Sequence, residues 1–586
     1  MSSLRVLILG GYGTFGGRLA QLLADEPRLT LIIAGRAHDK AEAFCTHLTA
    51  AAQLEPLAFD RDGAVERALA EAKPDIVVDA SGPFQNYAGD PYRLVRACLA
   101  LGVDYLDLAD GSEFVDGIAQ FDAAARARGV AMLSGVSSFP VLTAAVVRRL
   151  MRGTSPELAR LDSVAGGIAP SPYAGVGLNV IRAIASYAGK PVQLTRDGRP
   201  AVGRGLIETR RFTIAPPGCV PLRPTLFSLV DVPDLQALPR LWPGLQSVWM
   251  GAGPVPEILH RALIVLARAV PLGLLRSLGA FAPLMHAAVN VLRWGEHRGG
   301  MFVAVEGADV DGRSIARSWH MIAEGDDGPL IPSMAAEAII RRRLDGRRPA
   351  PGARAATGDL ELTDYEALFA RRKIFSGIRE TPPAAMPLYR RLLGDAYAQL
   401  PAPIQALHDL ADTLLVEGRA TIQRGRNPVA RAIAAVVGFP PAGENVPVKV
   451  MFTRRDGREV WRRSFADHAF TSTQEEGRGS FDRLMCERFG PFAFGIALTH
   501  VPAKWRPVRR QEHASIKDLG EPDRLRLIVR GWSIFRIPLP RALAPFGSAY
   551  ESAEDGRFHF HVEIRLPVIG LIVRYRGWLV PSVKSD

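Results

Sequence analysis

The order of apolar and polar positions changes character along the chain, and its first part is the most regular. Over residues 1–140, short apolar runs alternate with segments in which apolar residues recur at helical spacing. Short continuous apolar runs are typical of strands buried on both faces. Alternation of such strands with helices predicts an α/β domain with a doubly wound parallel sheet, the Rossmann arrangement. The expected strands are 5–9, 29–34, 55–60, 75–80, 103–108 and 130–134, with helices such as 64–72 and 92–101 between them.

The pattern becomes mixed between about residue 145 and residue 375. Apolar runs at 301–306 and 314–322 flank the Asp311–Gly312 pair, which predicts a β-hairpin. The following segment, 332–340, has helical spacing and opens with Pro332, a residue favoured in the first helical turn. This region is expected to be an α+β domain that binds substrate and provides a homodimer contact.

The last 200 residues follow two breaks rich in proline, at 347–358 and 381–385. Residues 388–437 have a largely helical pattern, and the remainder alternates with period two, as at 558–566. Period-two alternation predicts an antiparallel sheet with one buried face. Three domains are therefore expected: a Rossmann domain (1–145), an α+β middle domain (146–380) and a β-rich α+β domain (385–586).

A glycine-rich turn follows the first expected strand. Gly11, Gly13 and Gly16 form the pattern G-x-G-x-x-G between a strand and a helix, as a dinucleotide-binding turn requires. Glycine permits the tight turn, close approach to a pyrophosphate and close helix packing, while the helix N-terminus attracts phosphate charge. The turn predicts a cofactor site that includes Gly11, Gly13, Thr14, Phe15 and Gly16.

Residues after the second and third strands bear on which dinucleotide binds. Arg36 ends the second strand, where a site that prefers NAD usually has an acidic residue for the ribose hydroxyls. An arginine pairs well with a 2′-phosphate, so NADP(H) is favoured over NAD(H), although a solvated surface charge would also explain Arg36. Asp60 could reach the adenine amino group or could cap the following helix; both interpretations remain open.

Composition narrows the class of protein. The chain has 586 residues, of which 48% are hydrophobic and 23% charged, and its net charge is +12. This is the composition of a multidomain globular protein that would favour anionic partners. Its four cysteines are far apart, with no histidine cluster at ligand spacing, so we expect no disulfide framework and no metal. Leu4–Leu9 already belongs to the first expected strand, which favours a cytoplasmic protein without a signal peptide.

Residues 257–293 form a strongly apolar segment that is interrupted by arginines and prolines. Its longest stretch without charge, 277–292, is shorter than the roughly 20 residues needed to cross a bilayer. Two interpretations remain open. The segment could be a helical pair in the core or at an interface, or a hairpin lying on a membrane surface with its arginines toward the headgroups.

Two runs in the last region combine basic and aromatic residues, Arg454–Arg463 and Lys504–Arg510. Such residues could contact phosphates and stack on bases. Solvated strand faces beside turns explain them more simply, so nucleic acid is not an expected partner.

Several motifs together resemble a known family. Residues 1–375 are similar to the saccharopine dehydrogenase-like reductases, and the last 200 residues resemble a bacterial domain of unknown function found behind such reductases. The resemblance implies NAD(P) binding and oxidoreductase chemistry, with no particular substrate, although some relatives act on lipids. Many relatives have Gly-Glu where this chain has Ala109-Asp110, and no Lys–His pair resembles the acid–base couple of an amino-acid dehydrogenase. The matching segments are 10–16, 35–36, 80–84 with Tyr87, 103–108, 135–140, 327–332, 487–491 and 570–575.

The expected reaction is hydride transfer, for which the protein must position the acceptor and supply a proton. Tyr87, in the loop after the fourth strand, is the first candidate donor, followed by Asp107 and Asp110 after the fifth strand. Each could instead have a structural role, Tyr87 by packing its ring and Asp107 by binding backbone N–H groups. The residues expected around the nicotinamide are Ser81, Gly82, Pro83 and Ser137.

These observations predict an NADP(H)-dependent reductase that acts on a small hydrophobic or lipid-like carbonyl, imine or alkene. Two alternatives come from other classes of protein. The chain could be an NADP-binding sensor or scaffold without turnover, or a lipid carrier whose working part is the C-terminal domain.

Overall fold

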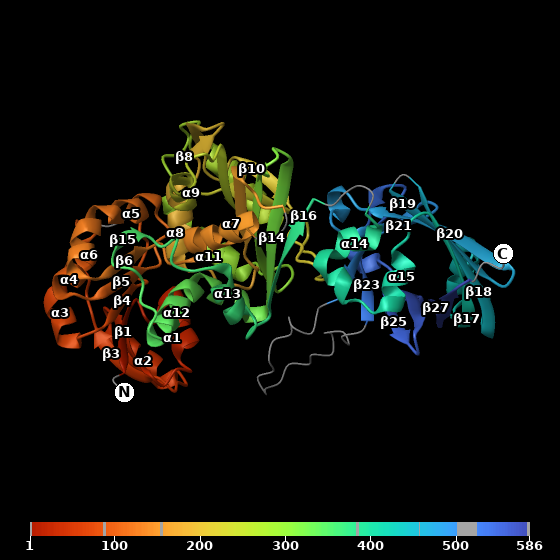
Figure 1. Ribbon diagram of the computed structural model, residues 1–586, viewed down its shortest axis with the longest axis horizontal. Helices are drawn as coiled ribbons and strands as arrows, with labels where there is room; N and C mark the ends of the chain where they lie inside the picture. Colours follow the sequence, from red (N-terminus) through yellow and green to blue (C-terminus); the bar gives the residue numbers. More distant parts are fainter. Residues whose placement is uncertain are drawn as a thin grey trace. The chain divides into compact units, whose positions relative to one another are not determined.

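The computed structural model describes residues 3–85, 89–152, 156–381, 386–455, 457–500 and 524–582. The chain forms two compact units (Figure 1). The N-terminal unit contains residues 1–212 and 225–374, and the C-terminal unit contains residues 213–224 and 375–586. The short segment 213–224 is therefore part of the C-terminal unit, although the chain on both sides of it belongs to the other.

The first sheet of the N-terminal unit is parallel and has the strand order β15-β6-β5-β4-β1-β2-β3. Strands β1 to β6 follow the order β6-β5-β4-β1-β2-β3, which is that of a Rossmann fold and confirms the predicted α/β class. The strands are β1 (Leu4–Leu9), β2 (Leu29–Gly35), β3 (Gln53–Ala58), β4 (Ile76–Asp79), β5 (Asp104–Asp107), β6 (Ala131–Ser134) and β15 (Gly352–Ala355).

Helices cover the parallel sheet, which explains its continuous apolar strands. All seven residues of β2 are buried, as expected for a strand covered on both faces. Leu69 and Leu94, from two covering helices, pack with strand residues such as Leu7 in one core cluster. The helices of this domain are α1 (Thr14–Leu23), α2 (His38–His47), α3 (Val65–Ala72), α4 (Arg93–Leu101), α5 (Ser112–Gly117), α6 (Asp122–Arg128) and α7 (Thr143–Arg152).

A second, mixed sheet forms the α+β part of the N-terminal unit. Its order is β10-β11-β12-β7-β13-β14, and β16 (Ile374–Glu380) lies at the boundary between the units. β13 and β14 pair from Arg298↔Glu324 to Ala308↔Ser314, which confirms the predicted hairpin. The other elements include β7 (Arg160–Ala169), α8 (Leu178–Tyr187), β8 (Pro191–Arg196), β9 (Arg199–Arg204), β10 (Thr209–Phe212), β11 (Thr225–Leu229), α9 (Asp234–Leu241), β12 (Ser247–Ala252), β13 (Arg298–Ala308), β14 (Ser314–Glu324) and α13 (Leu362–Phe369).

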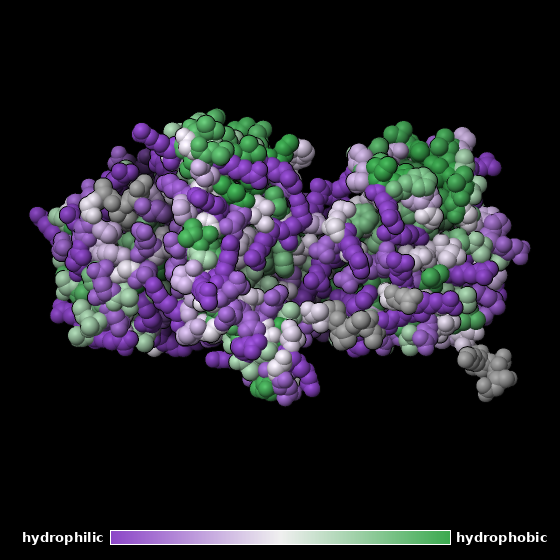
Figure 2. Space-filling view, turned by 90° about the horizontal axis from the view of Figure 1, so that it is seen from above, coloured by the Kyte–Doolittle hydropathy of each residue, from purple (hydrophilic) through white to green (hydrophobic). Residues whose placement is uncertain are grey.

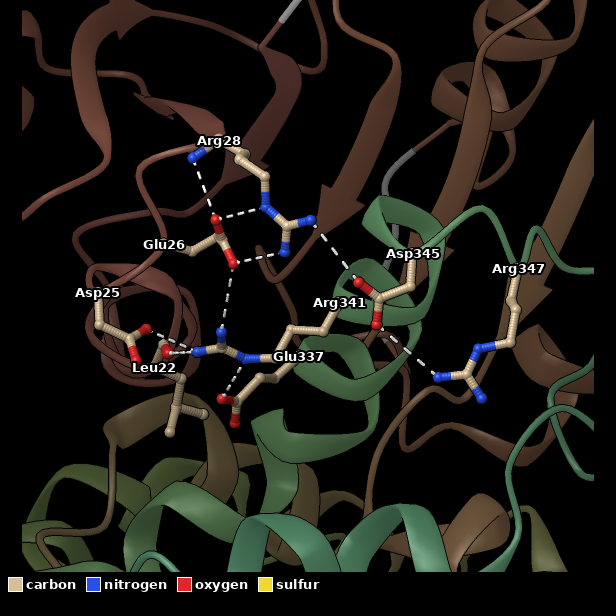
Figure 3. Close-up of polar contacts among 8 residues, drawn as sticks. All are labelled: Leu22, Asp25, Glu26, Arg28, Glu337, Arg341, Asp345 and Arg347. Carbon is tan, nitrogen blue, oxygen red and sulfur yellow. Dashed lines mark hydrogen bonds and ion pairs between the residues drawn. The ribbon is translucent and has the colours of Figure 1, made fainter. Parts of the chain in front are cut away.

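α12 (Ile331–Leu344), the helix predicted to open with a proline, ties the two parts of this unit together. Arg341 donates to the Leu22 carbonyl oxygen and contacts Asp25 at 2.6 Å, both at the end of α1 (Figure 3). Its Nε donates to Glu337 at 3.0 Å, one turn earlier on α12. Glu26 pairs with both Arg341 and Arg28, so the network extends to the turn before β2 (Figure 3).

The C-terminal unit is built on a closed antiparallel sheet. Its strands follow the order β22-β21-β20-β19-β18-β17-β27-β26-β25-β23, and pairing between β22 and β23 closes the ring, with β24 (Ile537–Pro538) at its edge. Apolar side chains such as Phe452, Trp461 and Phe465 fill its core. The ring strands are β17 (Thr413–Arg424), β18 (Gly443–Arg455), β19 (Arg458–Phe465), β20 (His468–Glu476), β21 (Met485–Phe489), β22 (Phe492–Thr499), β23 (Arg524–Ile534), β25 (Ala549–Glu554), β26 (Arg557–Leu566) and β27 (Gly570–Pro581).

The expectation that residues 388–437 are largely helical is wrong in its middle part. Three α-helices occur, α14 (Leu388–Leu393), α15 (Ala402–His408) and α16 (Pro428–Val437), with a 3₁₀ helix at Gly394–Gln399, but β17 lies between the last two α-helices. Gly418 at the centre of β17 lies against the Trp578 carbonyl oxygen of β27, too close to leave room for a side chain. This close approach of two strands, together with β-branched residues such as Thr421 and Ile422, favours the extended conformation.

The apolar segment 257–293 forms two short helices, α10 (Glu257–Arg268) and α11 (Ala282–Val291), joined by a loop with one 3₁₀ turn. Its inner residues Ile264, Ala267 and Leu278 are buried, but many of its large apolar side chains are exposed. None of the helices in the described ranges combines the length and the apolar character needed to cross a bilayer.

Candidate functional site

The glycine turn between β1 and α1 is built so closely that side chains do not fit. Gly10 has a φ of +77°, a conformation in which only glycine is unstrained. A β-carbon on Gly11 would lie 2.8 Å from the Ile8 carbonyl oxygen, and one on Gly16 would lie even closer to that of Gly10. Gly13 caps α1, and its amide donates to the Gly10 carbonyl oxygen at 2.8 Å. The turn therefore exposes backbone where a dinucleotide pyrophosphate would bind, as the motif predicts.

A second helix begins at the same place. Gly177 caps α8, and a β-carbon there would lie 2.9 Å from Thr14 Oγ1, at the start of α1. Neither helix has an acidic residue in its first turn or a side-chain cap within the described residues. Two positive helix ends thus converge without a compensating negative charge, an arrangement that fits an anionic ligand. Arg18 fixes the loop before α8 by donating to the Ala174 carbonyl oxygen at 2.9 Å.

The end of β2 has the features expected for the adenosine part of the cofactor. Arg36 is exposed and makes no ion pair or hydrogen bond with any described residue, so its guanidinium is available to a 2′-phosphate. Tyr12, which the sequence analysis did not single out, covers Gly35 and accepts a hydrogen bond from the Ala37 amide at 3.1 Å. Asp60 lies two residues beyond β3, where it accepts from the Asp62 amide and stabilises a turn.

The loop after β4 is held by polar contacts on both sides. Ser81 Oγ donates to Asp79 Oδ1 at 2.5 Å, and Arg61 Nη1 donates to Ser81 Oγ at 3.0 Å. The Gly82 carbonyl oxygen accepts from Asn179 Nδ2 at 2.8 Å, which links this loop to α8. Ser81, Gly82 and the half-buried Pro83 thus lie at the carboxyl end of β4, next to the glycine turn at the end of β1.

Asp107 and Ser137 lie near the ends of neighbouring strands but differ in their surroundings. Asp107 is fully buried, and its Oδ1 accepts from the Ala109 and Gly135 amides and from the Ser134 hydroxyl at 2.8–3.0 Å. Burial raises the pKa of Asp107 to about 7. These contacts favour its structural role, which is to join the loops after β5 and β6. Ser137 is half-buried, in extended backbone just after β6.

Asp110 belongs to a half-buried polar cluster at the same sheet edge. Gln85 Nε2 donates to Asp110 Oδ1 at 3.0 Å, and Ser112 Oγ donates to Asp231 Oδ1 at 2.8 Å. Burial and the charge of Asp231 raise the pKa of Asp110, and burial also raises the pKa of Asp231. Tyr187, the last residue of α8, lies close enough for both carboxylates to add to the burial that raises its own pKa. We call Gln85, Asp110, Ser112, Tyr187 and Asp231 the Asp110 cluster.

The position of α8 relates this cluster to the glycine turn. The helix starts beside Thr14 and ends at Tyr187, so its ten residues span about 15 Å between the two sites. The sequence analysis predicted Asp110 but missed Gln85, Ser112, Tyr187 and Asp231. Of these four, only Asp231 has a sequence signal that could have marked it as a site residue, namely its position two residues after the short strand β11. Tyr87, the first candidate for the proton donor, lies outside the described residues.

The fold and this turn define a Rossmann-type dinucleotide-binding protein, and comparisons with known proteins match two parts of the chain to known domain families. Residues 6–133 match the saccharopine dehydrogenase NADP-binding domain, and residues 400–579 match a domain of unknown function, DUF4166. The N-terminal domain is thus an NADP-binding domain of the saccharopine dehydrogenase type, which confirms the predicted family resemblance and cofactor. The chain is accordingly an NAD(P)-dependent oxidoreductase. A comparison with curated proteins gave no match.

Solved structures match this chain at low identity. Saccharopine dehydrogenase (L-Glu forming) from Saccharomyces cerevisiae is 12% identical, with 65% of this chain and 100% of the other covered and a TM-score of 0.45. An oxidoreductase from Sinorhizobium meliloti is 10% identical, with 63% and 96% covered and a TM-score of 0.30. A dehydrogenase from Clostridium difficile is 9% identical, with 62% and 97% covered and a TM-score of 0.28.

Proposed function

We propose that the N-terminal unit reduces a small hydrophobic carbonyl, imine or alkene with NADP(H), and that Asp110 supplies the proton. The observation that carries this proposal is the raised pKa of Asp110, which results from burial and from the charge of Asp231. A carboxyl group with a raised pKa retains its proton nearer to neutral pH, as a general acid must. The cluster lies at the carboxyl edge of the parallel sheet, where ligands of such folds bind.

Each residue of the Asp110 cluster has its own role in the proposed reaction. Bound NADPH supplies the hydride, and the chain holds the substrate and delivers the proton. Gln85 binds Asp110 Oδ1, which fixes the carboxyl group and leaves its second oxygen for the substrate. Ser112 holds Asp231 in place, so that its charge adds to the effect of burial in keeping Asp110 protonated until transfer. Tyr187 remains a neutral phenol because burial raises its pKa, and it can donate a hydrogen bond to the same substrate atom.

The preference for a hydrophobic substrate is supported by the environment of α8. Ile181 and Ala185 of this helix belong to an apolar cluster with Ala267, Leu278 and Ala282 from the 257–293 segment. One helix therefore borders both the polar cluster and the most apolar surface segment of the unit. A lipid-carrier role for the C-terminal domain is less well supported, because apolar side chains fill the core of its closed sheet.

The test is NADPH oxidation with a panel of hydrophobic aldehydes, ketones, imines and enones. We expect Asp110→Asn to lower kcat by about 10²–10⁴-fold because the general acid is lost, with unchanged NADPH affinity. Asp116→Asn, which removes an exposed carboxylate of the nearby α5, is the matched control and should leave kcat unchanged. Arg36→Asp should weaken NADPH binding by tenfold or more and NADH binding much less.

Two results would contradict the proposal. If Asp110→Asn retained the wild-type kcat, Asp110 would not be the proton donor. If the wild-type protein bound NADPH tightly but oxidised it with no compound of the panel or of a lipid extract, the sensor alternative would be favoured instead.

A further inference from the structure

The 257–294 segment presents large apolar side chains to solvent. Of the 23 exposed large hydrophobic residues in the described chain, ten lie in this stretch. Leu272 and Leu274, in the loop after α10, are 72% and 74% exposed, and Trp294 is 71% exposed. Hydrophobic side chains gather on one area of the N-terminal unit in Figure 2. We call these ten residues the apolar face: Ile258, Val265, Leu266, Leu272, Leu274, Phe281, Leu284, Val291, Leu292 and Trp294.

The apolar face is separate from the side of the segment that packs on the protein. Ile258 and Val265 are seven residues apart on α10, and Leu284 and Val291 are seven apart on α11, so each pair lies on one outward stripe. Buried residues on the inner side, such as Ile264, already hold the helices in place. The exposed stripes are therefore not explained by folding, and contiguous exposed apolar surface of this kind marks an interaction site.

The charges of the segment specify what would cover it. Arg261, Arg268, Arg276 and Arg293 are exposed, whereas Glu257 is the only acidic residue between positions 257 and 294. Glu257 is already bound by Arg211 at 2.8 Å and by Arg261 at 2.7 Å. The segment therefore combines exposed leucines and a tryptophan with excess positive charge, the combination that binds the interface of anionic membranes.

We propose that the apolar face docks on an anionic lipid surface, with its leucines among the acyl chains and its arginines on the headgroups. A second copy of the chain is a poorer occupant. A symmetric dimer places the same patch on both sides of the interface, which would bring the arginines of the two copies together without acidic partners. This inference does not depend on the substrate proposed above.

The experiment is flotation of the full-length protein with vesicles through a density gradient. We expect the wild type to float with vesicles of phosphatidylcholine and phosphatidylglycerol, weakly with phosphatidylcholine alone, and less at high salt. Leu272→Asp with Leu274→Asp should lower the bound fraction at least about tenfold, because two apolar groups no longer insert. Arg268→Glu with Arg276→Glu should lower it about tenfold or more on anionic vesicles only.

Matched variants exclude general effects of the substitutions. Val202→Asp with Val310→Asp adds the same two charges at exposed valines outside the segment, and Arg199→Glu reverses an exposed arginine on β9. All of these variants should keep the wild-type melting temperature, and the controls should float like the wild type. The proposal fails if the wild type remains at the bottom of the gradient without vesicles, or if the double leucine variant floats as the wild type does. It also fails if that variant abolishes a dimer seen by sedimentation while no form of the protein binds vesicles.

Discussion

Two sets of carboxylates, one in each unit, lie in opposite electrostatic surroundings. In the N-terminal unit, burial raises the pKa values of Asp107, Asp110, Asp231 and Asp234. None of these four has a lysine, arginine or histidine within ion-pair distance among the residues that the structure describes. In the closed sheet, by contrast, the buried Glu487 contacts Arg463 at 3.0 Å.

Two more carboxylates of the closed sheet, Glu551 and Glu563, also have nitrogen partners. Glu551 forms a 2.6 Å hydrogen bond with His408, which stacks on Tyr389. Hydrogen bonds from Arg565 and Arg574 lower the pKa of Glu563. Because a buried carboxylate without a partner costs stability, a fold normally supplies one, as the C-terminal unit does for Glu487 and Glu551. Among the described residues of the N-terminal unit, Asp110 and Asp231 have no such cation and lie at the edge where its ligand would bind, as expected of a chemical site rather than a structural one.

The largest expected effect concerns Glu487, the buried carboxylate that has a cationic partner. Arg463→Met should destabilise the C-terminal unit by about 3–5 kcal/mol, because Glu487 would remain buried without its cation. The substitution also removes the 2.7 Å hydrogen bond from Arg463 to Ser472. Calorimetric unfolding measures the loss. Arg458→Met, which breaks the more exposed pair with Glu475, should cost less than about 1 kcal/mol, and equal losses in the two variants would contradict the argument.

A smaller effect concerns the dependence of stability on pH. Burial raises the pKa of Asp234 to about 7, well above its unfolded value of 3.8. The folded state therefore holds a proton that the unfolded state has released, and this stability is lost as pH rises through about 7. Asp234 should make the N-terminal unit more stable at pH 6 than at pH 8, by about 1.4 kcal/mol in total.

Asp234→Asn should flatten this dependence, as measured by urea unfolding at a series of pH values. The difference between variant and wild type is needed because His260 acts in the opposite direction. Burial lowers the pKa of His260 to about 4, so the unfolded state gains a proton there as pH falls below 6.5. A variant with the wild-type pH dependence would show that Asp234 does not hold the proton.

The sequence predicted features that local patterns encode and missed those that arise from distant contacts. The glycine turn and the parallel strands were predictable because adjacent residues carry their signals. Ser112 and Asp231 are 119 residues apart, and no local pattern indicates that they meet. The helical pattern assigned around β17 failed for the same reason, since Gly418 is required by contact with the Trp578 carbonyl oxygen, far along the chain.

The smallest expected effect tests Asp110 and Asp231, the carboxylates without a cationic partner among the described residues. Asp231→Asn removes the like charge that contributes to the raised pKa of Asp110, but leaves the larger contribution from burial. The pKa of Asp110 should therefore fall by less than about one unit, which moves the pH above which NADPH oxidation declines to a lower value. Asp116→Asn, on the exposed surface, should not move the profile. A shift toward higher pH in Asp231→Asn would mean that Asp231 stabilises the ionised form of Asp110. Asp110 would then not be a proton donor whose proton is retained by the charge of Asp231.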